Sequence, residues 1–399
     1  MKIIVTGSSF ASTVCILNLV KNGFKPILID SDIDIKISKI ELQKDNKSKI
    51  LNPIQSIGGL SNFWSGSVDE YSDKDLTDWP ISYEDLKVHY KNIFNNFNFK
   101  KYSNKEFLLK NFENSNVNFA SNIIKENKDY QLKFADTLVE KSSESEIKFD
   151  KLTPYSFRNK IIELLENKKI DLIKGTLLKF LEKKDKIIIE YIKNNEIKKL
   201  EVDFLFLGSG AISTYKILFN SINFDTNLIT LKTQQKLLTP IIFNKYKIKR
   251  HHFYFSHPLF QINLNRNKQS IYGQIYNFNI NIFKHMFPKI KKYEFTKFFY
   301  FIFKKFGFVY FTFGSDLCDQ FSIKNNKILL RENKTNVINI LKEFKYLYNF
   351  DFSYEVFKLL KLNLKRNSLS GNHFGASFPM SNLKNNFSTS INGRLNGIK

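Results

Sequence analysis

The sequence predicts an α/β protein (α+β overall) that joins a helix-covered parallel sheet to a second domain built on an antiparallel sheet. The first observation is a short apolar strand at 2–6 that runs at once into a glycine and an amphipathic helix. The second is another strand, glycine turn and helix at 203–218. The third is the clean polar–apolar alternation at 277–282, which is typical of a half-buried strand. Strand–helix units favour a parallel sheet, whereas alternating strands favour an antiparallel one.

Residues 2–30 have the pattern of one strand–helix–strand unit. The helix follows Gly7 and stops near Asn22-Gly23, and the strand 26–29 ends on Asp30. In dinucleotide-binding folds, the first glycine makes the turn, the helix amino terminus binds the pyrophosphate, and an acidic residue about 20 positions on binds the ribose. The spacing therefore predicts a Rossmann-type unit whose candidate nucleotide contacts are Gly7, Ser8, Ser9, Phe10, Ala11, Ser12 and Asp30.

Two serines stand where the dinucleotide fingerprint has its second and third glycines. A β-carbon at Ser9 crowds the pyrophosphate, and one at Ser12 crowds the packing of the helix on the strand. Serine is the smallest polar replacement, so the nucleotide site is weakened and not excluded. The alternative is an ordinary strand–helix–strand unit without a nucleotide.

The run 58–66, Gly-Gly-Leu-Ser-Asn-Phe-Trp-Ser-Gly, is the most informative in the chain. The adjacent Gly58 and Gly59 let the backbone approach a planar or phosphorylated ligand closely. Ser61 and Asn62 offer side-chain hydrogen bonds beside them. Further on, Ser82 and Asp85 have the spacing of a capping box that starts a helix.

Together with Trp79-Pro-Ile-Ser-Tyr83, this run resembles the glucose–methanol–choline (GMC) oxidoreductase family. The resemblance implies FAD as the cofactor, with Trp64 in the segment against the flavin. The run 203–214 resembles the later strand and glycine turn of the family, and 175–178 its contact to adenine. These segments add the candidate cofactor contacts Leu178, Gly208, Ser209 and Gly210.

The C-terminal run 371–380 resembles the histidine-containing motif of the family, in the form found in a branch linked to surface-glycan chemistry. Oxidation of an alcohol needs a group that accepts the hydroxyl proton as hydride leaves. The resemblance implies His373 as that base, while Asn372 occupies the position where many members have their histidine. The implied substrate is a small alcohol or a sugar hydroxyl, with a lipid-linked sugar as one form of it.

The sequence ends at Lys399, where family members continue with a strand and a closing helix. A truncated product, a broken gene and a naturally short form all stay open. One alternative function is therefore an inactive remnant with weak nucleotide binding. Another is an NAD- or NADP-binding Rossmann protein, which the segment 58–64 argues against.

The expected domain organisation follows these motifs. We expect a first part of the FAD-binding domain, a polar insertion, a second part of the FAD-binding domain, a substrate domain, and a C-terminal part of the FAD-binding domain, at 1–120, 121–150, 151–234, 235–364 and 365–399. Within these, we expect a helix at 156–167, strands at 187–191, 204–207, 253–263 and 306–313, and a helix over 336–362.

The formal net charge is +24, which raises the question of a nucleic-acid partner. The basic residues are spread along the chain and accompany abundant Asn, Ile and Phe, which favours codon bias over a nucleic-acid footprint. Cys15 and Cys318 have no metal or disulfide spacing, so we expect a reducing, cytoplasmic location. The histidines near 251–257 lack accompanying carboxylates, which favours no metal site.

The apolar runs 298–303 and 306–313 are too short to cross a bilayer, which takes about 20 residues. Residues 283–311 interleave lysines with aromatic residues, a pattern that also occurs in segments lying on anionic membranes. An ordinary part of the substrate domain is the favoured interpretation. Peripheral association with the inner membrane face is the alternative.

Overall fold

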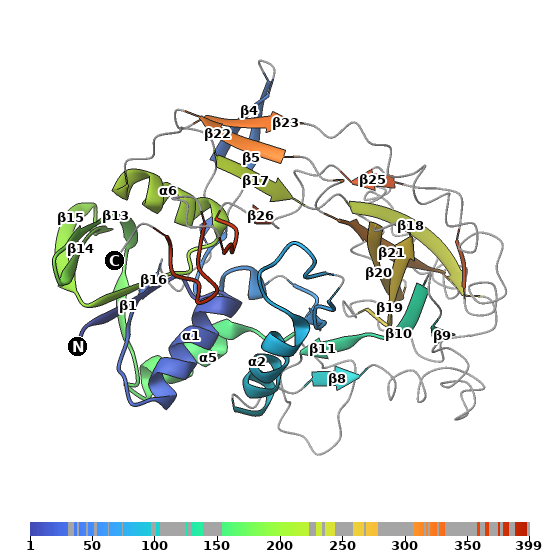
Figure 1. Ribbon diagram of the computed structural model, residues 1–399, viewed down its shortest axis with the longest axis horizontal. Helices are drawn as coiled ribbons and strands as arrows, with labels where there is room; N and C mark the ends of the chain where they lie inside the picture. Colours follow the sequence, from blue (N-terminus) through green and yellow to red (C-terminus); the bar gives the residue numbers. More distant parts are fainter. Residues whose placement is uncertain are drawn as a thin grey trace, which may run out of the picture.

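The computed structural model describes the parallel-sheet region almost fully and the remainder in segments (Figure 1). The described residues are 1–30, 36–37, 40–44, 47–51, 54–62, 64–73, 75–96, 101–103, 125–126, 130–138, 154–222, 229–233, 236–243, 258–266, 269–277, 306–314, 317, 320–324, 327–331, 357–359, 364–366, 374–375, 378–382 and 388–396.

Four parallel strands form the first sheet, in the order β12 (Asp171–Lys174), β2 (Ile27–Asp30), β1 (Ile3–Thr6) and β16 (Phe204–Leu207). Val5 in β1 is in register with Leu28 and with Phe206. All four residues of β1 are buried, because both faces of the sheet are covered at this central strand. The carboxyl ends of β1, β2 and β16 consequently lie at one edge.

Helices cover one face of the parallel sheet. Here α1 (Phe10–Lys21) and α5 (Phe157–Glu166) enclose a core that contains Val5, Ile16 and Phe157. On the other face, Ile4 packs with the antiparallel strands β13 (Thr176–Lys183), β14 (Lys186–Lys193) and β15 (Glu196–Val202), and with α6 (Ala211–Ser221). Successive residues of one strand thus serve two cores, as the period of two requires.

The second sheet is large and antiparallel, and it lies on the right of Figure 1. Its strands, in spatial order, are β24 (Phe357–Leu359), β18 (Lys236–Phe243), β21 (Phe306–Phe313), β20 (Gln269–Asn277), β19 (Phe260–Arg266), β10 (Tyr130–Phe134) and β9 (Lys125–Glu126), and β25 (Leu364–Arg366) also pairs with β18. The predicted combination of a parallel and an antiparallel sheet is confirmed.

A third sheet brings together segments that are far apart in sequence. Its order is β26 (Phe374–Gly375), β17 (Ile229–Thr233), β22 (Gln320–Lys324), β23 (Lys327–Arg331), β4 (Ile40–Lys44) and β5 (Lys47–Leu51). The remaining elements are β3 (Lys36–Ile37), β6 (Ile54–Gln55), the short 3-10 helix η1 (Gly59–Asn62), β7 (Ser67–Val68), α2 (Tyr83–Asn96), β8 (Lys101–Ser103) and β11 (Asp136–Leu138).

Several predicted elements are confirmed at their bounds. The helix expected at 156–167 is α5 with its caps, and the strand expected at 306–313 is β21. The expected polar insertion supplies β9 and β10 to the large antiparallel sheet. Within the helix expected over 336–362, the described residues 357–359 form the strand β24, so that part of the prediction is wrong. Pairing with β18 overrides the apolar spacing that suggested a helix there.

Candidate functional site

The candidate site lies at the edge where β1, β2 and β16 end. Gly7 follows β1 with a φ of +75°, and its N–H donates to the carbonyl of Ile29 at 3.0 Å. A β-carbon at Gly7 would lie 2.6 Å from the carbonyl oxygen of Gly208, which follows β16. Glycine is therefore required at position 7 both for the left-handed backbone and for the close approach of the two strand ends.

The buried Ser8 links three segments at this edge. Its hydroxyl donates to the Asp30 carboxylate at the end of β2 and accepts from the N–H of Gly58 at 2.7 Å. The Thr13 hydroxyl in turn donates to the carbonyl of Ser8 at 2.9 Å. Asp30 is thereby held beside the first turn of α1, as the spacing predicts. Thr13 was missed in the sequence because nothing in a helix pattern marks a hydroxyl that bonds back to the preceding turn.

Each of the two serines in the fingerprint faces a glycine from a distant segment. A β-carbon at Gly59 would lie 3.3 Å from Cβ of Ser9. A β-carbon at Gly208 would lie 1.8 Å from Oγ of Ser12. The Ser12 hydroxyl donates to the carbonyls of Gly208 at 3.1 Å and Thr6 at 3.3 Å. Gly208 thus relieves the crowding that was expected between Ser12 and the strand end, and Gly59 leaves room for the side chain of Ser9.

Two helices begin at this edge without a side-chain cap. Ser9 is the N-cap of α1 and makes no side-chain cap hydrogen bond, and Gly210 is the N-cap of α6 with a φ of +82°. The first internal bonds are those from Thr13 N–H to Ser9 and from Thr214 N–H to Gly210, both 2.9 Å. The preceding N–H groups of each helix donate to none of the residues that the structure describes. Two positive helix ends therefore lie after adjacent strands, which suits an anionic ligand.

The segment at 58–62 is locked onto the start of α5. Ser61 Oγ donates to the carbonyl of Gly58 at 2.6 Å and accepts from the N–H of Phe157 at 3.2 Å. Asn62 Oδ1 accepts from Ser156 Oγ at 2.8 Å, and its amide donates to the carbonyl of Ile57 at 2.9 Å. Ser61 and Asn62 were predicted to contact a cofactor. In the structure these hydrogen bonds instead hold the glycine loop against the start of α5. Ser156, the α5 N-cap, was recognised in the sequence only as a helix start.

An aromatic cluster stands beside the start of α1. The ring of Phe10 lies 4.9 Å from that of Phe157 and 6.3 Å from that of Trp64, between ring centroids. Trp64 Nε1 donates to the carbonyl of Tyr155 at 2.8 Å. These contacts fix Trp64 against the α1–α5 core, while Phe10 stays 36% exposed at the helix end.

Leu178 lies on β13, beyond the end of β2. The N–H of Gly175 donates to the carbonyl of Asp30 at 2.9 Å, which places the start of β13 at the candidate site. Leu178 itself occupies an irregularity in the pairing of β13 with β14, and its carbonyl accepts from Asn220 Nδ2 of α6 at 3.3 Å. The backbone at 175–178 thus borders the edge on the side of Asp30.

The predicted catalytic pair, His373 and Asn372, lies outside the described residues. The adjoining strand β26 pairs with β17, through Gly375 with Lys232 and Phe374 with Thr233. The histidines near 251–257 are also outside the described residues. Among the residues that are described, no cluster of three or more His, Cys, Asp or Glu is arranged to hold a metal.

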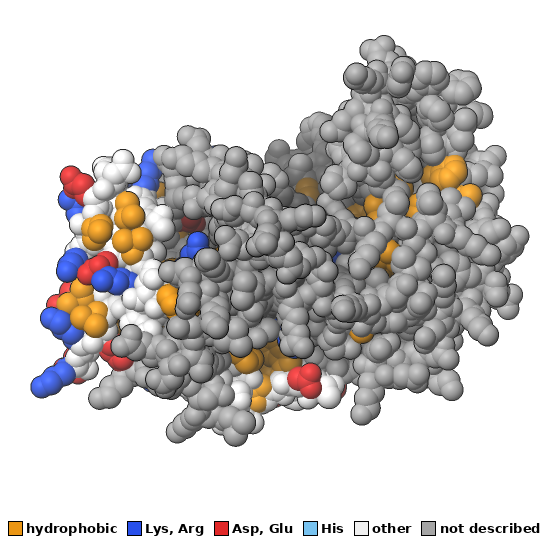
Figure 2. Space-filling view, turned by 90° about the horizontal axis from the view of Figure 1, so that it is seen from above, with side chains coloured by type: hydrophobic (Ala, Val, Ile, Leu, Met, Phe, Trp, Pro, Cys, Tyr) orange, Lys and Arg blue, Asp and Glu red, His pale blue; other side chains and the backbone are white. Residues whose placement is uncertain are grey.

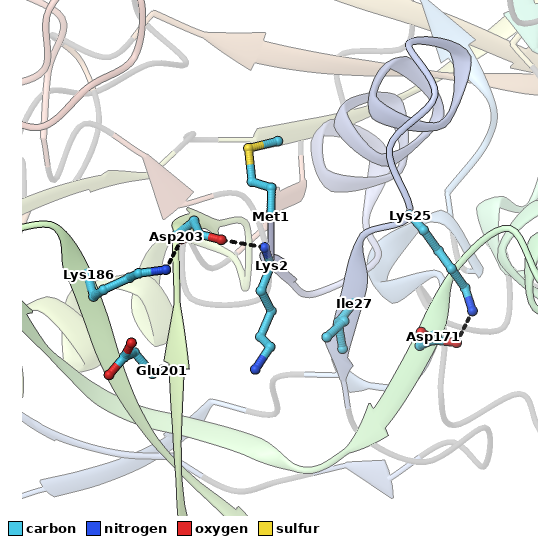
Figure 3. A pocket seen from close by; sticks show the side chains of 8 residues that line it. All are labelled: Met1, Lys2, Lys25, Ile27, Asp171, Lys186, Glu201 and Asp203. Atoms are coloured by element: carbon cyan, nitrogen blue, oxygen red, sulfur yellow. Dashed lines mark hydrogen bonds and ion pairs between the residues drawn. The ribbon is translucent and has the colours of Figure 1, made fainter.

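A separate hollow of about 430 Å³ lies at the opposite edge of the parallel sheet (Figure 3). Lys25 pairs with Asp171 at 2.7 Å there, and Lys186 pairs with Asp203. The hydrogen bond from Lys186 lowers the pKa of Asp203 below its usual range, and the backbone N–H of Lys2 lowers it further. The hollow is open and its two aspartates, Asp171 and Asp203, are paired with lysines, so we place the candidate site at the glycine-rich edge.

Charge of both signs is interspersed over the β13–β15 sheet, at the left of Figure 2. Glu190 pairs with Lys179 at 3.2 Å and with Lys199 at 3.1 Å. The described part of this surface is therefore a mixed face and not a basic patch. In the part of the chain that the structure describes, no helix has the length and apolar character needed to cross a membrane.

Comparison with known proteins gives remote similarities only. No family model matches the chain, and no curated protein matches it. One similar structure is the tetracycline destructase Tet(51), with 10% identity and a TM-score of 0.30 over 78% of this chain and 56% of that one. Another is the p-nitrophenol 4-monooxygenase PnpA from Pseudomonas putida DLL-E4, with 10% identity and a TM-score of 0.27 over 61% of this chain and 48% of that one.

A third is CabE, an aromatic hydroxylase from angucycline biosynthesis, with 8% identity and a TM-score of 0.31 over 91% of this chain and 52% of that one. The chain thus spans about half the length of these structures. At such TM-scores, the similarities assign neither a fold family nor an activity. Membership of the GMC family stays a prediction from the motifs.

Proposed function

We propose that this chain is an FAD-dependent oxidoreductase whose nucleotide binds at the glycine-rich edge of the parallel sheet. The observation that carries the proposal is that two helix ends without side-chain caps, those of α1 and α6, follow the adjacent strands β1 and β16, while Ser8 before α1 bonds to the Asp30 carboxylate. The strand order β12-β2-β1-β16, with α1 between β1 and β2, agrees with a Rossmann-type unit.

The residues at this edge fit the parts of an FAD molecule. The open N–H groups after Ser9 would bind the pyrophosphate, and Asp30 would accept hydrogen bonds from the ribose hydroxyls. A β-carbon at Gly210 would meet nothing within 4 Å, so the start of α6 also has room for a ligand. The start of β13, joined to Asp30 through Gly175, would border the adenine.

The proposed reaction is oxidation of an alcohol or sugar hydroxyl, in the manner of the GMC family. Bound FAD supplies the hydride acceptor for such chemistry. We assign His373 as the group that takes the hydroxyl proton, with Asn372 beside it as a hydrogen-bond partner. This assignment is supported by the motif 371–380 and by the need for a base in the reaction. From the same motif we propose surface-glycan synthesis as the process in which the enzyme acts.

The test is anaerobic reduction of the protein-bound flavin by a panel of primary alcohols and free sugars, followed by absorbance. We expect at least one class to bleach the flavin spectrum. Retention of FAD with no reduction by any member would contradict the proposed activity. It would favour the second hypothesis, a non-catalytic remnant of such an enzyme.

A further inference from the structure

The hydroxyl of Ser8 is the middle link of a hydrogen-bond chain that joins three segments of the protein. The N–H of Gly58 donates to Ser8 Oγ at 2.7 Å, and the same hydroxyl donates to Oδ2 of Asp30. A peptide N–H can only donate and a carboxylate can only accept, so the direction of this chain is fixed. The hydroxyl proton of Ser8 therefore points at Asp30.

The Gly58 end of the chain is held by contacts that do not involve Ser8. The carbonyl of Gly58 accepts from Ser61 Oγ at 2.6 Å and from the Ser61 N–H at 3.1 Å. A β-carbon at Gly58, where φ is +91°, would lie 2.8 Å from Asn62 Oδ1 and 2.9 Å from Cβ of Arg158 on α5. The Gly58 N–H is thus a fixed donor, packed against the start of α5.

The backbone of Ser8 is fixed as well. The Thr13 hydroxyl, fully buried in α1, donates to the Ser8 carbonyl at 2.9 Å. The N–H of the preceding Gly7 donates to the carbonyl of Ile29 at 3.0 Å. Because Ser8 is itself only 2% exposed, its hydroxyl is held by the turn between β1 and α1.

The side chain of Asp30 is the part of the chain that strand pairing does not fix. Its backbone lies at the end of β2, where its carbonyl accepts from the Gly175 N–H at 2.9 Å. Its side chain is half-buried and has rotamers to choose from. The bond from Ser8 selects one orientation of the carboxylate. Two carboxylate oxygens can accept about four hydrogen bonds, so that bond leaves capacity for a ligand.

We propose that Ser8 is a positioning residue, whose hydroxyl orients the Asp30 carboxylate to accept hydrogen bonds from the ribose hydroxyls of an adenosine nucleotide. That the nucleotide is FAD rests on the proposed function, whereas the orientation of Asp30 by Ser8 does not. An acceptor oriented in advance loses less freedom when the ligand binds. The dinucleotide fingerprint leaves the position of Ser8 variable, so the motif by itself does not predict this role.

The test compares two ligands that differ only in the ribose hydroxyls. The full chain is dialysed to remove bound nucleotide and is titrated by calorimetry with ADP and with 2′,3′-dideoxy-ADP. We expect the parent to bind ADP roughly tenfold more tightly than the dideoxy compound. In Ser8→Ala this ratio should fall towards one, while the affinity for the dideoxy compound changes little. An unchanged ratio in Ser8→Ala would overturn the proposal.

Ser56→Ala is the matched control, because it removes another buried serine hydroxyl from the same glycine loop. Ser56 is 3% exposed, and its Oγ accepts from Asn62 Nδ2 at 3.0 Å. We expect Ser56→Ala and Ser8→Ala to lower the melting temperature similarly, since each loses buried hydrogen bonds. The preference for ADP should persist in Ser56→Ala. Equal loss of that preference in both variants would overturn the proposal, because general loosening of the loop would then explain it.

A double-mutant cycle on ADP affinity shows whether Ser8 acts through Asp30. In an Asp30→Ala background, Ser8→Ala should have little further effect, because the carboxylate that it orients is absent. The same fold-loss of ADP affinity with and without Asp30 would overturn the positioning role. It would show that the Ser8 hydroxyl contacts the ligand directly.

Titration of the same samples with FAD and FMN distinguishes this proposal from the proposed function. A parent that prefers ADP over its dideoxy form, but binds neither FAD nor FMN, would contradict the flavin-dependent oxidoreductase and support the role of Ser8. Tight FAD binding, together with an undiminished ADP preference in Ser8→Ala, would contradict the role of Ser8 and leave the FAD site intact.

Discussion

The hydroxyl of Ser12 occupies the space that a side chain at Gly208 would need. A β-carbon at Gly208 would lie 1.8 Å from Ser12 Oγ, and the same hydroxyl donates to the Gly208 carbonyl at 3.1 Å. A small residue is thus needed where α1 meets the ends of β1 and β16, and here it is the glycine at the end of β16. The packing that the fingerprint glycine normally permits is retained.

Gly208→Ala should destabilise the protein by about 1–3 kcal/mol, because the new methyl group collides with Ser12. In a Ser12→Gly background the same substitution should lower the free energy of unfolding by less, since the collision is removed. Chemical unfolding of the four proteins measures this double-mutant cycle. Gly375→Ala is the control, because its β-carbon would meet nothing within 4 Å. If Gly208→Ala lowered the free energy of unfolding equally in both backgrounds, the collision between Ser12 and a side chain at position 208 would be contradicted.

Asp30→Ala should weaken FAD retention, because it removes hydrogen bonds to the ribose that are worth about 1 kcal/mol each. The Ser8 hydroxyl also loses its acceptor. Flavin released during dialysis is the measurement, and we expect roughly tenfold faster loss. Asp171→Ala, at the other end of the same sheet and paired with Lys25, is the matched control. If both variants retained flavin like the parent, Asp30 would have no part in the site.

His373→Ala should slow flavin reduction by roughly 100-fold or more while FAD stays bound. A histidine suits the role because its ordinary pKa of about 6.5 leaves it mostly neutral at pH 7. Anaerobic stopped-flow reduction of His373→Ala, His373→Asn and Asn372→Ala measures the effect. Reduction of His373→Ala at the parental rate, together with loss of reduction in Asn372→Ala, would assign the role to the neighbouring residue.

The exposed pair Lys186–Asp203 predicts a small pH dependence of stability. The hydrogen bond from Lys186 lowers the pKa of Asp203 in the folded protein. The contribution of the pair is therefore present above the ordinary pKa of about 3.9 and is lost as the pH falls through the lowered value. Asp203→Asn should reduce the melting temperature at pH 7 more than at pH 3. The same reduction at both pH values would show that the carboxylate charge does not contribute.

Local patterns predicted the elements that position the site. Three of them are visible in the sequence: the strand at 2–6, the helix after Gly7 and the strand that ends on Asp30. They are visible because the spacing of apolar residues, the turn residues and the helix caps are all local properties of the chain. The capped helix α5 was predicted for the same reason, since Ser156 and Asn167 mark its ends.

Relationships between distant residues could not be predicted from one sequence. Gly208 relieves the crowding at Ser12 from 196 positions away, and Ser61 and Asn62 turn out to hold the start of α5. The large antiparallel sheet likewise forms only when β10 pairs with β19, more than a hundred residues later. Alternation within each strand predicts a polar face, but register decides which side chains share it.

The identity of the nucleotide released on denaturation tests the central claim most directly. The protein is purified without added cofactor, denatured, and the supernatant is separated by chromatography with absorbance and mass detection. We predict FAD, because the two open helix ends, Asp30 and the Gly58–Gly59 loop together fit a dinucleotide with an extended ring system. Release of NAD alone from a chain that is otherwise folded would contradict the account.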